Sequence, residues 1–180
     1  TGRNQYVLDL CRAEVQDYII ANVNATLASA PIDYVKWDMN RHISDNYSPA
    51  LAEQGRFSHS YILGLYRVLQ SIVEQNPDVL FEGCSSGGNR FDLGILCYMP
   101  QIWTSDDTDA YERQLIQAGT SYGYPPSVMG CHASASPNHQ TARTSPIESR
   151  FNVAAFGVLG YELDLGRLTP AEQKAVAAQI

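Results

Sequence analysis

The chain has 180 residues, of which 44% are hydrophobic, and its formal net charge is -7. This length and composition allow one domain with a buried core, and no apolar run reaches the roughly 20 residues needed to cross a membrane. The acidic balance, without any cluster of Lys and Arg, argues against a nucleic-acid partner.

Short apolar runs alternate with helical segments along the chain, which is typical of parallel β/α structure. We expect six strands, at Gln5–Leu10, Ile32–Asp38, Val79–Cys84, Gln101–Asp106, Ser127–His132 and Tyr161–Leu165.

Two helices are marked most clearly. Phe57–Val73 carries apolar residues at spacings of three and four, which predicts a helix that buries one face, and Asn76-Pro77 ends it. Near the C-terminus, Thr169 can cap a helix whose first position is Pro170 and which continues over Ala171–Ile180, with Glu172 completing a capping box.

The alternation leaves two architectures, a doubly wound open sheet or part of an eight-stranded barrel. A dinucleotide-binding sheet should have a glycine-rich turn after its first strand, but Asp9–Ala13 contains no glycine. Polar residues instead follow nearly every expected strand, as they do around a barrel rim. The sequence therefore predicts an α/β fold, a partial (β/α)8 TIM barrel with about six of the eight β/α units, in a single domain over residues 1–180.

Asp38 ends the second expected strand. Alternation along a strand places Lys36, Asp38 and Asn40 on one face, while Val35 and Trp37 face the helical layer. A nearby lysine favours the ionised carboxylate, which suits a nucleophile. The structural alternatives are that Asp38 caps the next helix or pairs with Arg41.

Asp106 ends the fourth expected strand and opens a cluster that includes Asp107 and Asp109. Helix capping explains Asp107 or Asp109 well. Asp106 follows the apolar Ile102 and Trp103, which favour a raised pKa and hence a general acid. A pair of carboxylates, one nucleophile and one acid, is the minimal equipment for cleaving a glycosidic bond, so the pattern indicates a glycosidase.

The loop Glu82–Asp92 is rich in small residues. It lacks the Gly-Lys-Ser/Thr ending of a phosphate-binding loop, which argues against a nucleotide. Its glycines permit close approach of the backbone to a ligand such as a sugar, although a simple tight turn is the other interpretation.

The cysteines and histidines give weaker signals. Four widely spaced cysteines favour free thiols and a reducing compartment. The spacing of His132 and His139 fits no zinc motif, so we expect no metal site and interpret these histidines, with Cys131 and Asn138 nearby, as structural residues of a loop that bonds to the rim. The N-terminus has no leader and no initiator Met, and we expect it to be a cut end.

Six segments of the chain, among them those that carry Asp38, Asp106 and the glycine-rich loop, resemble segments of the family 36 glycoside hydrolases. These are the α-galactosidases of the melibiase and raffinose-degrading type. In family order they are Gly2–Leu10, Lys36–Arg41, Cys84–Asp92, Trp103–Asp109, Pro137–Gln140 and Gly160–Asp164.

The resemblance implies a (β/α)8 catalytic barrel that retains anomeric configuration, with Asp38 as nucleophile and Asp106 as acid/base. In a retaining enzyme the two carboxyl groups are about 5 to 5.5 Å apart. The residues that match family contacts to galactose are Arg3, Lys36, Asn40, Cys84 and Gly87. The substrates are α-galactoside oligosaccharides, and no metal or organic cofactor is implied. Full-length members are often cytoplasmic tetramers, so a homo-oligomer is expected.

The chain departs from the family pattern in two ways. It lacks the N-terminal β-sandwich, the first barrel strands and the C-terminal β domain of full-length members, which predicts a catalytic-domain fragment. Asn89 also stands where many members have glycine. The alternatives to a hydrolase are a galactosyltransferase of the raffinose-synthase type and a non-catalytic sugar-binding fragment.

Overall fold

The computed structural model describes residues 4–180, which divide into two compact units. The first unit contains the described residues up to Ser85 together with Asp92–Pro100. The second contains Ser86–Phe91 and Gln101–Ile180.

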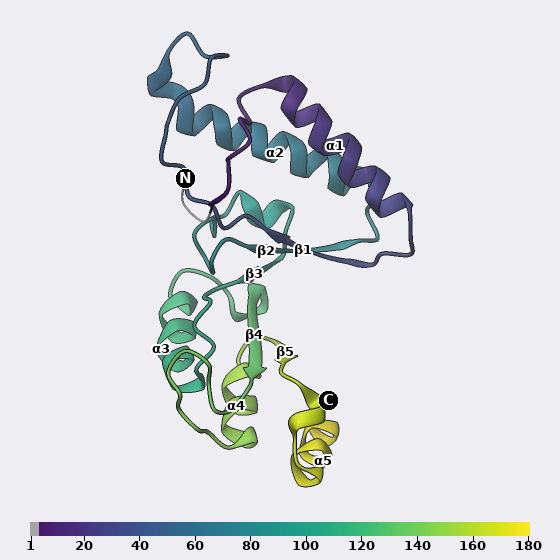
Figure 1. The fold of residues 1–180 in the computed structure, drawn as a ribbon, viewed down its shortest axis with the longest axis vertical. Helices are drawn as coiled ribbons and strands as arrows, with labels where there is room; N and C mark the ends of the chain where they lie inside the picture. The colour runs from purple at the N-terminus through teal and green to yellow at the C-terminus, as the bar shows by residue number, and fades with distance from the viewer. Residues whose placement is uncertain (1–3) are drawn as a thin grey trace. The chain divides into compact units, whose positions relative to one another are not determined.

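The first unit is built on two parallel strands, β1 (Tyr34–Asp38) and β2 (Leu80–Cys84). Their register pairs Lys36 with Glu82 and Asp38 with Cys84. Two long helices, α1 (Ala13–Ala28) and α2 (Phe57–Gln75), run side by side next to these strands (Figure 1). Short 3-10 turns at Gln54–Arg56 (η2) and Ile95–Cys97 (η3) complete the unit.

Helix α2 buries one apolar face, as the spacing of apolar residues over Phe57–Val73 predicts. The buried positions on it are Phe57, Tyr61, Leu65, Val68, Leu69 and Ile72. Gly64 lies on the same helix, and a β-carbon there would stand 1.9 Å from the carbonyl oxygen of Leu10. Glycine at this position therefore lets the segment before α1 pack directly against α2.

The second unit contains three parallel strands, β3 (Gln101–Trp103), β4 (Met129–Ser134) and β5 (Val158–Glu162). Its helices are α3 (Ala110–Ser121), α4 (Ile147–Ala154) and α5 (Pro170–Gln179), with 3-10 turns at Pro126–Val128 (η4) and Leu165–Arg167 (η5). A small core joins β4 to α4 and β5, formed by Met129, Cys131, Ala133, Ala154, Leu159 and Tyr161.

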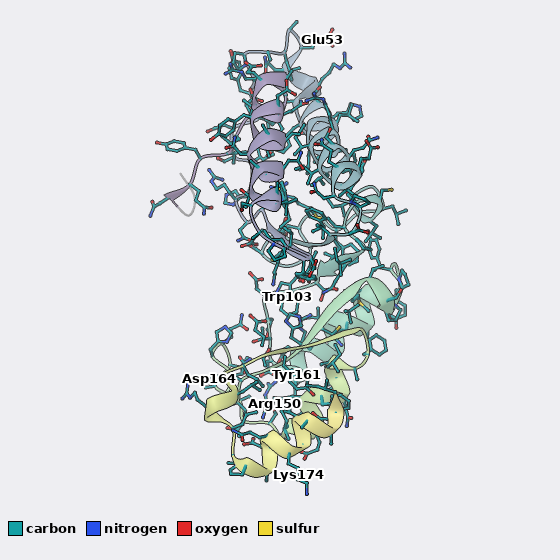
Figure 2. The ribbon with its side chains drawn as sticks, turned by 90° about the vertical axis from the view of Figure 1, so that its right-hand side faces the viewer. Glu53, Trp103, Arg150, Tyr161, Asp164 and Lys174 are labelled. Carbon is teal, nitrogen blue, oxygen red and sulfur yellow. The ribbon has the colours of Figure 1, made fainter. Side chains whose placement is uncertain are left out.

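Helix α5 begins as the sequence predicts. The Thr169 hydroxyl accepts from the Glu172 N–H while the Glu172 carboxylate accepts from the Thr169 N–H, so the capping box is confirmed. Figure 2 shows Arg150 and Tyr161 on the inner side of this helix and Lys174 on its outer side. Arg150 lies 3.6 Å from Glu172, and the Tyr161 hydroxyl donates to Gln179, so both ends of α5 are held by side chains.

Strands β1 and β2 start at Tyr34 and Leu80, slightly inside the predicted ranges, and the other four predicted strands differ more. The described residues contain five strands, because Gln5–Leu10 is not a strand. Tyr6 and Leu8 are 89% and 54% exposed, and within residues 4–180 this segment joins no β-ladder, without which a strand does not form. The count of six β/α units is therefore not confirmed.

The other three differences are shifts. Strand β3 ends at Trp103, not at Asp106, because the chain bends where Ser105 accepts from the Asp107 N–H. Strand β4 starts at Met129 because the residues before it form η4. Strand β5 starts at Val158 and ends at Glu162, so it only overlaps the start of the predicted Tyr161–Leu165, and Leu165 begins η5.

The strands that pair are parallel and most are followed by helices, which fits a partial (β/α)8 barrel. Among residues 4–180, no helix combines the length and the apolar character that a membrane span requires.

Candidate active site

Asp38 is the last residue of β1 and is exposed. The Asn40 side-chain amide donates to its Oδ2 at 2.6 Å. Beyond the strand, the Met39 N–H donates to the Cys84 carbonyl at 2.8 Å, so the β1–β2 pairing extends past Asp38 and fixes the direction of its backbone. The helix-capping alternative is wrong for this residue, because the N-cap of α2 is Arg56.

Lys36 and Asp38 lie on the same face of β1, as the alternation predicts. Lys36 forms an ion pair with Glu82, at 3.8 Å between Nζ and Oε1. Glu82 is only 2% exposed and also accepts from the Tyr34 hydroxyl. Burial, with the hydrogen bond to Glu82 and its charge, raises the pKa of Tyr34. Sequence reasoning missed Glu82, although its place directly across from Lys36 follows from the register of two parallel strands.

Asp106 lies three residues beyond the end of β3 and is exposed. The indole N–H of Trp103 donates to its Oδ1 at 3.2 Å. Trp103 is 3% exposed, so a buried aromatic side chain contacts a carboxylate that faces solvent. The apolar neighbour expected behind Asp106 is thus present, and it also supplies a hydrogen-bond donor.

Asp109 confirms the capping interpretation. It is the N-cap of α3, accepts from the Tyr111 N–H at 2.8 Å, and forms an ion pair with Arg143 at 2.8 Å. Burial opposes its ionisation, but the hydrogen bonds from Thr141, Tyr111 and Arg143 and the charge of Arg143 outweigh it and lower the pKa of Asp109. Asp107 accepts from the Asp109 N–H and so closes the turn.

The Pro137–Gln140 segment braces the same turn. Asn138 is 6% exposed, donates to the Thr108 hydroxyl at 2.9 Å, and accepts from the N–H groups of Gln140 and Thr141. The Gln140 side chain accepts from the Thr108 N–H at 2.9 Å. Asn138 therefore stabilises the turn that carries Asp106.

The glycine-rich loop approaches protein backbone closely. Ser86 and Gly87 both have positive φ, at 53° and 86°. A β-carbon on Gly87 would stand 2.6 Å from the Ser105 Cα, and the Gly88 N–H donates to the Thr104 carbonyl at 3.1 Å. Glycine is required here because any larger residue would displace the segment that leads to Asp106.

His132 lies within β4, so its placement in a loop was wrong. Its Nδ1 is 3.2 Å from a Glu162 carboxylate oxygen on β5. A β-carbon on Gly160 would stand 2.4 Å from the His132 ring, so glycine makes room for it. In the part of the chain that the structure describes, no three His, Cys, Asp or Glu residues gather as metal ligands would.

The predicted site residues thus fall into two groups. The first unit brings together Lys36, Asp38, Asn40 and the buried Cys84, which pairs with Asp38 in the ladder. The second unit holds Asp106 on the segment that Gly87 contacts. Arg3 lies outside the described residues.

The melibiase family model matches residues 1–180. Among curated relatives, the α-galactosidase AgaA of Geobacillus stearothermophilus is 54% identical over 99% of this chain and 25% of its own length. The α-galactosidase Mel36A of Lactobacillus acidophilus is 52% identical over the same shares. The chain thus spans about a quarter of the length of the curated relatives it matches.

Solved structures agree with these matches. The crystal structure of the family 36 α-galactosidase AgaA from G. stearothermophilus matches with a TM-score of 0.96 at 53% identity, covering 99% of this chain and 25% of that one. A variant of the same enzyme in complex with raffinose has a TM-score of 0.96 at 52% identity, with the same coverage.

Proposed function

Because the chain belongs to the melibiase family, we propose that it is part of a retaining α-galactosidase. The proposed substrates are the terminal α-D-galactosyl groups of melibiose, raffinose-type oligosaccharides and related galactosides. The observation that carries the proposal is that Asp38 lies at the carboxyl end of a parallel strand and Asp106 lies just beyond another, where barrel enzymes keep their catalytic groups. The relatives named α-galactosidase, and the raffinose complex of one of them, support the choice of substrate.

The proposed reaction has two displacements. The Asp38 carboxylate attacks the anomeric carbon, the bond to the leaving oxygen breaks, and Asp106 transfers its proton to that oxygen. Asp106 then takes a proton from water, whose oxygen attacks the anomeric carbon and releases Asp38. Two inversions at one carbon return the original anomeric configuration.

The remaining predicted residues bind galactose in this proposal. Lys36 and Asn40 share the face of β1 that ends in Asp38, so their donors suit sugar hydroxyls close to the reacting carbon. Glu82 holds the Lys36 ammonium in place. Cys84, Gly87 and Arg3 are proposed as further contacts to the sugar.

Labelling tests the nucleophile. The full-length enzyme is treated with a mechanism-based galactosyl reagent whose ester intermediate hydrolyses slowly, and the labelled peptide is sequenced by mass spectrometry. We expect the label on Asp38 and α-galactose as the first product seen by NMR. A label on another residue, or β-galactose as the first product, would overturn the proposed mechanism.

The same intermediate could be passed to a sugar instead of water. Product analysis with galactinol as the donor and excess sucrose as the acceptor separates a raffinose-synthase-type transferase from a hydrolase. We expect free galactose to dominate. Galactose binding without any turnover by the full-length enzyme would instead support a non-catalytic sugar-binding role.

We also propose that the enzyme is a cytoplasmic homo-oligomer. All four cysteines are free thiols, which agrees with a reducing compartment. Cell fractionation and light scattering of the full-length enzyme test the two parts of this proposal separately.

A further inference from the structure

Trp103 is a buried residue that contacts the proposed acid/base. It is 3% exposed and is the last residue of β3. Its indole N–H donates to Oδ1 of Asp106 at 3.2 Å. Since Asp106 itself is exposed, this hydrogen bond limits the directions its carboxyl group can take.

Arg113 holds the indole from α3. Its guanidinium carbon lies 4.0 Å from the centroid of the Trp103 ring, and the side chain is 1% exposed. The same guanidinium donates to the Thr104 hydroxyl at 2.6 Å and to the Ser105 carbonyl at 2.8 Å. A buried cation over an aromatic face is attracted to it, so Arg113 fixes both the ring and the backbone that leads to Asp106.

Strand β4, which pairs with β3, holds the indole as well. The His132 ring centroid lies 4.6 Å from that of Trp103, and His132 is in turn held by Glu162. Gly130 pairs with Trp103 in the ladder, and a β-carbon on it would stand 3.4 Å from the indole. The position of the indole is therefore determined by α3 and β4 together.

We propose that Trp103 is a positioning residue for the acid/base, and that its indole N–H selects which oxygen of Asp106 carries the transferred proton. The inference rests on the proposed function, in which Asp106 protonates the leaving oxygen. A protonated carboxyl group accepts hydrogen bonds best at its carbonyl oxygen. Because the indole N–H occupies Oδ1, the proton resides on Oδ2 and is delivered from there.

Leaving groups provide a specific readout. A poor leaving group such as the sugar of raffinose needs the proton as its bond breaks, whereas a nitrophenolate leaves without much help. In the full-length enzyme, Trp103→Phe keeps an aromatic ring for Arg113 and removes the N–H. We expect kcat/KM to fall about 10-fold or more on raffinose and less than about 3-fold on 4-nitrophenyl α-galactoside.

A second replacement distinguishes the effect of losing the indole N–H from the effect of changing the packing around it. Benzothienylalanine at position 103 has nearly the shape of tryptophan with sulfur in place of the N–H, so it tests the donor even where Trp103→Phe does not fold. We expect the same selective loss on raffinose. The matched control is Tyr122→Phe on a residue that is 93% exposed in the same unit, and it should change neither rate.

A double-mutant cycle shows whether Trp103 acts through Asp106. Adding Trp103→Phe to Asp106→Asn should cost nothing further if the indole acts only on that carboxyl group. An equal fall on both substrates, or an undiminished effect in the Asp106→Asn background, would overturn the positioning role. A wild-type enzyme that cleaves neither substrate would instead overturn the proposed function on which this inference depends.

Discussion

The two proposed catalytic carboxylates are supported in different ways within their own units. Asp38 is positioned mainly by a strand, because it is the last residue of β1, which pairs with the parallel strand β2. The Asn40 side-chain amide also donates to its carboxylate. Asp106 lies on a turn beyond its strand, and this turn is held by side chains from β3, α3 and the Pro137–Gln140 segment. A site residue outside regular structure needs side-chain bracing that a residue on a strand obtains from the ladder.

The largest expected effects separate the chemical roles of the two carboxylates. Asp38→Asn removes the nucleophile and should reduce kcat by more than about 10³-fold on every α-galactoside, whatever the leaving group. Asp106→Asn should reduce kcat/KM by about 10² to 10⁴-fold on raffinose and far less on a nitrophenyl galactoside. Steady-state kinetics on both substrates make the comparison. If Asp106→Asn reduced both rates equally, the assignment of the acid would be wrong.

Asn138→Ala tests the bracing of the acid/base turn. The change removes the hydrogen bonds that Asn138 makes with the Thr108 hydroxyl and with the N–H groups of Gln140 and Thr141, so we expect a loss of about 2 to 3 kcal/mol in the free energy of unfolding. We also expect about a 10-fold lower kcat/KM on raffinose, because Asp106 loses its fixed position. Thermal unfolding and kinetics measure the two effects.

The matched control for this change is His139→Ala, since His139 is the exposed neighbour of Asn138. It should change neither stability nor rate appreciably. Similar losses in the two variants would mean that the segment as a whole, and not the Asn138 hydrogen bonds, supports the turn.

Asp109 makes the bracing depend on pH. Its folded pKa is lowered below the unfolded value of about 3.9, so its contribution to stability is present above that value and is lost as pH falls through the folded pKa. Asp109→Asn should therefore lower the Tm clearly at pH 7 and progressively less below about pH 4. Glu112→Gln, which removes only the longer contact to Arg143 at 3.3 Å, should shift the Tm less. A constant Tm difference from pH 7 to pH 3 would contradict this.

Local sequence patterns predicted the features that depend on neighbouring residues. The buried stripe of α2, the capping box at Thr169 and the cap at Asp109 each follow from residues within a few positions of one another. The place of Lys36 and Asp38 on one strand face follows from period-two geometry in the same way.

Features that depend on distant residues were not accessible. Strand β5 contains Gly160, which weakens any local strand signal, and glycine is needed there only because His132 from β4 occupies the adjacent space. Likewise the pairing of Lys36 with Glu82 requires the register of β1 against β2. The Gln5–Leu10 segment was predicted as a strand from its local pattern, but it has no ladder partner among the described residues and therefore does not form one.

Glu82→Gln gives the smallest expected effect and bears most directly on how the first unit is organised. Glutamine still accepts from the Tyr34 hydroxyl but no longer attracts the Lys36 ammonium, so we expect kcat/KM to fall about 3-fold with little change in stability. Tyr34→Phe, the matched control, leaves the carboxylate in place and should change kcat/KM by less than about 2-fold. If Glu82→Gln left kcat/KM unchanged, the strand alone would position Lys36. A fall as large as that of Asn138→Ala would mean that the first unit depends on side-chain bracing as much as the second does, and the contrast between the two carboxylates would not hold.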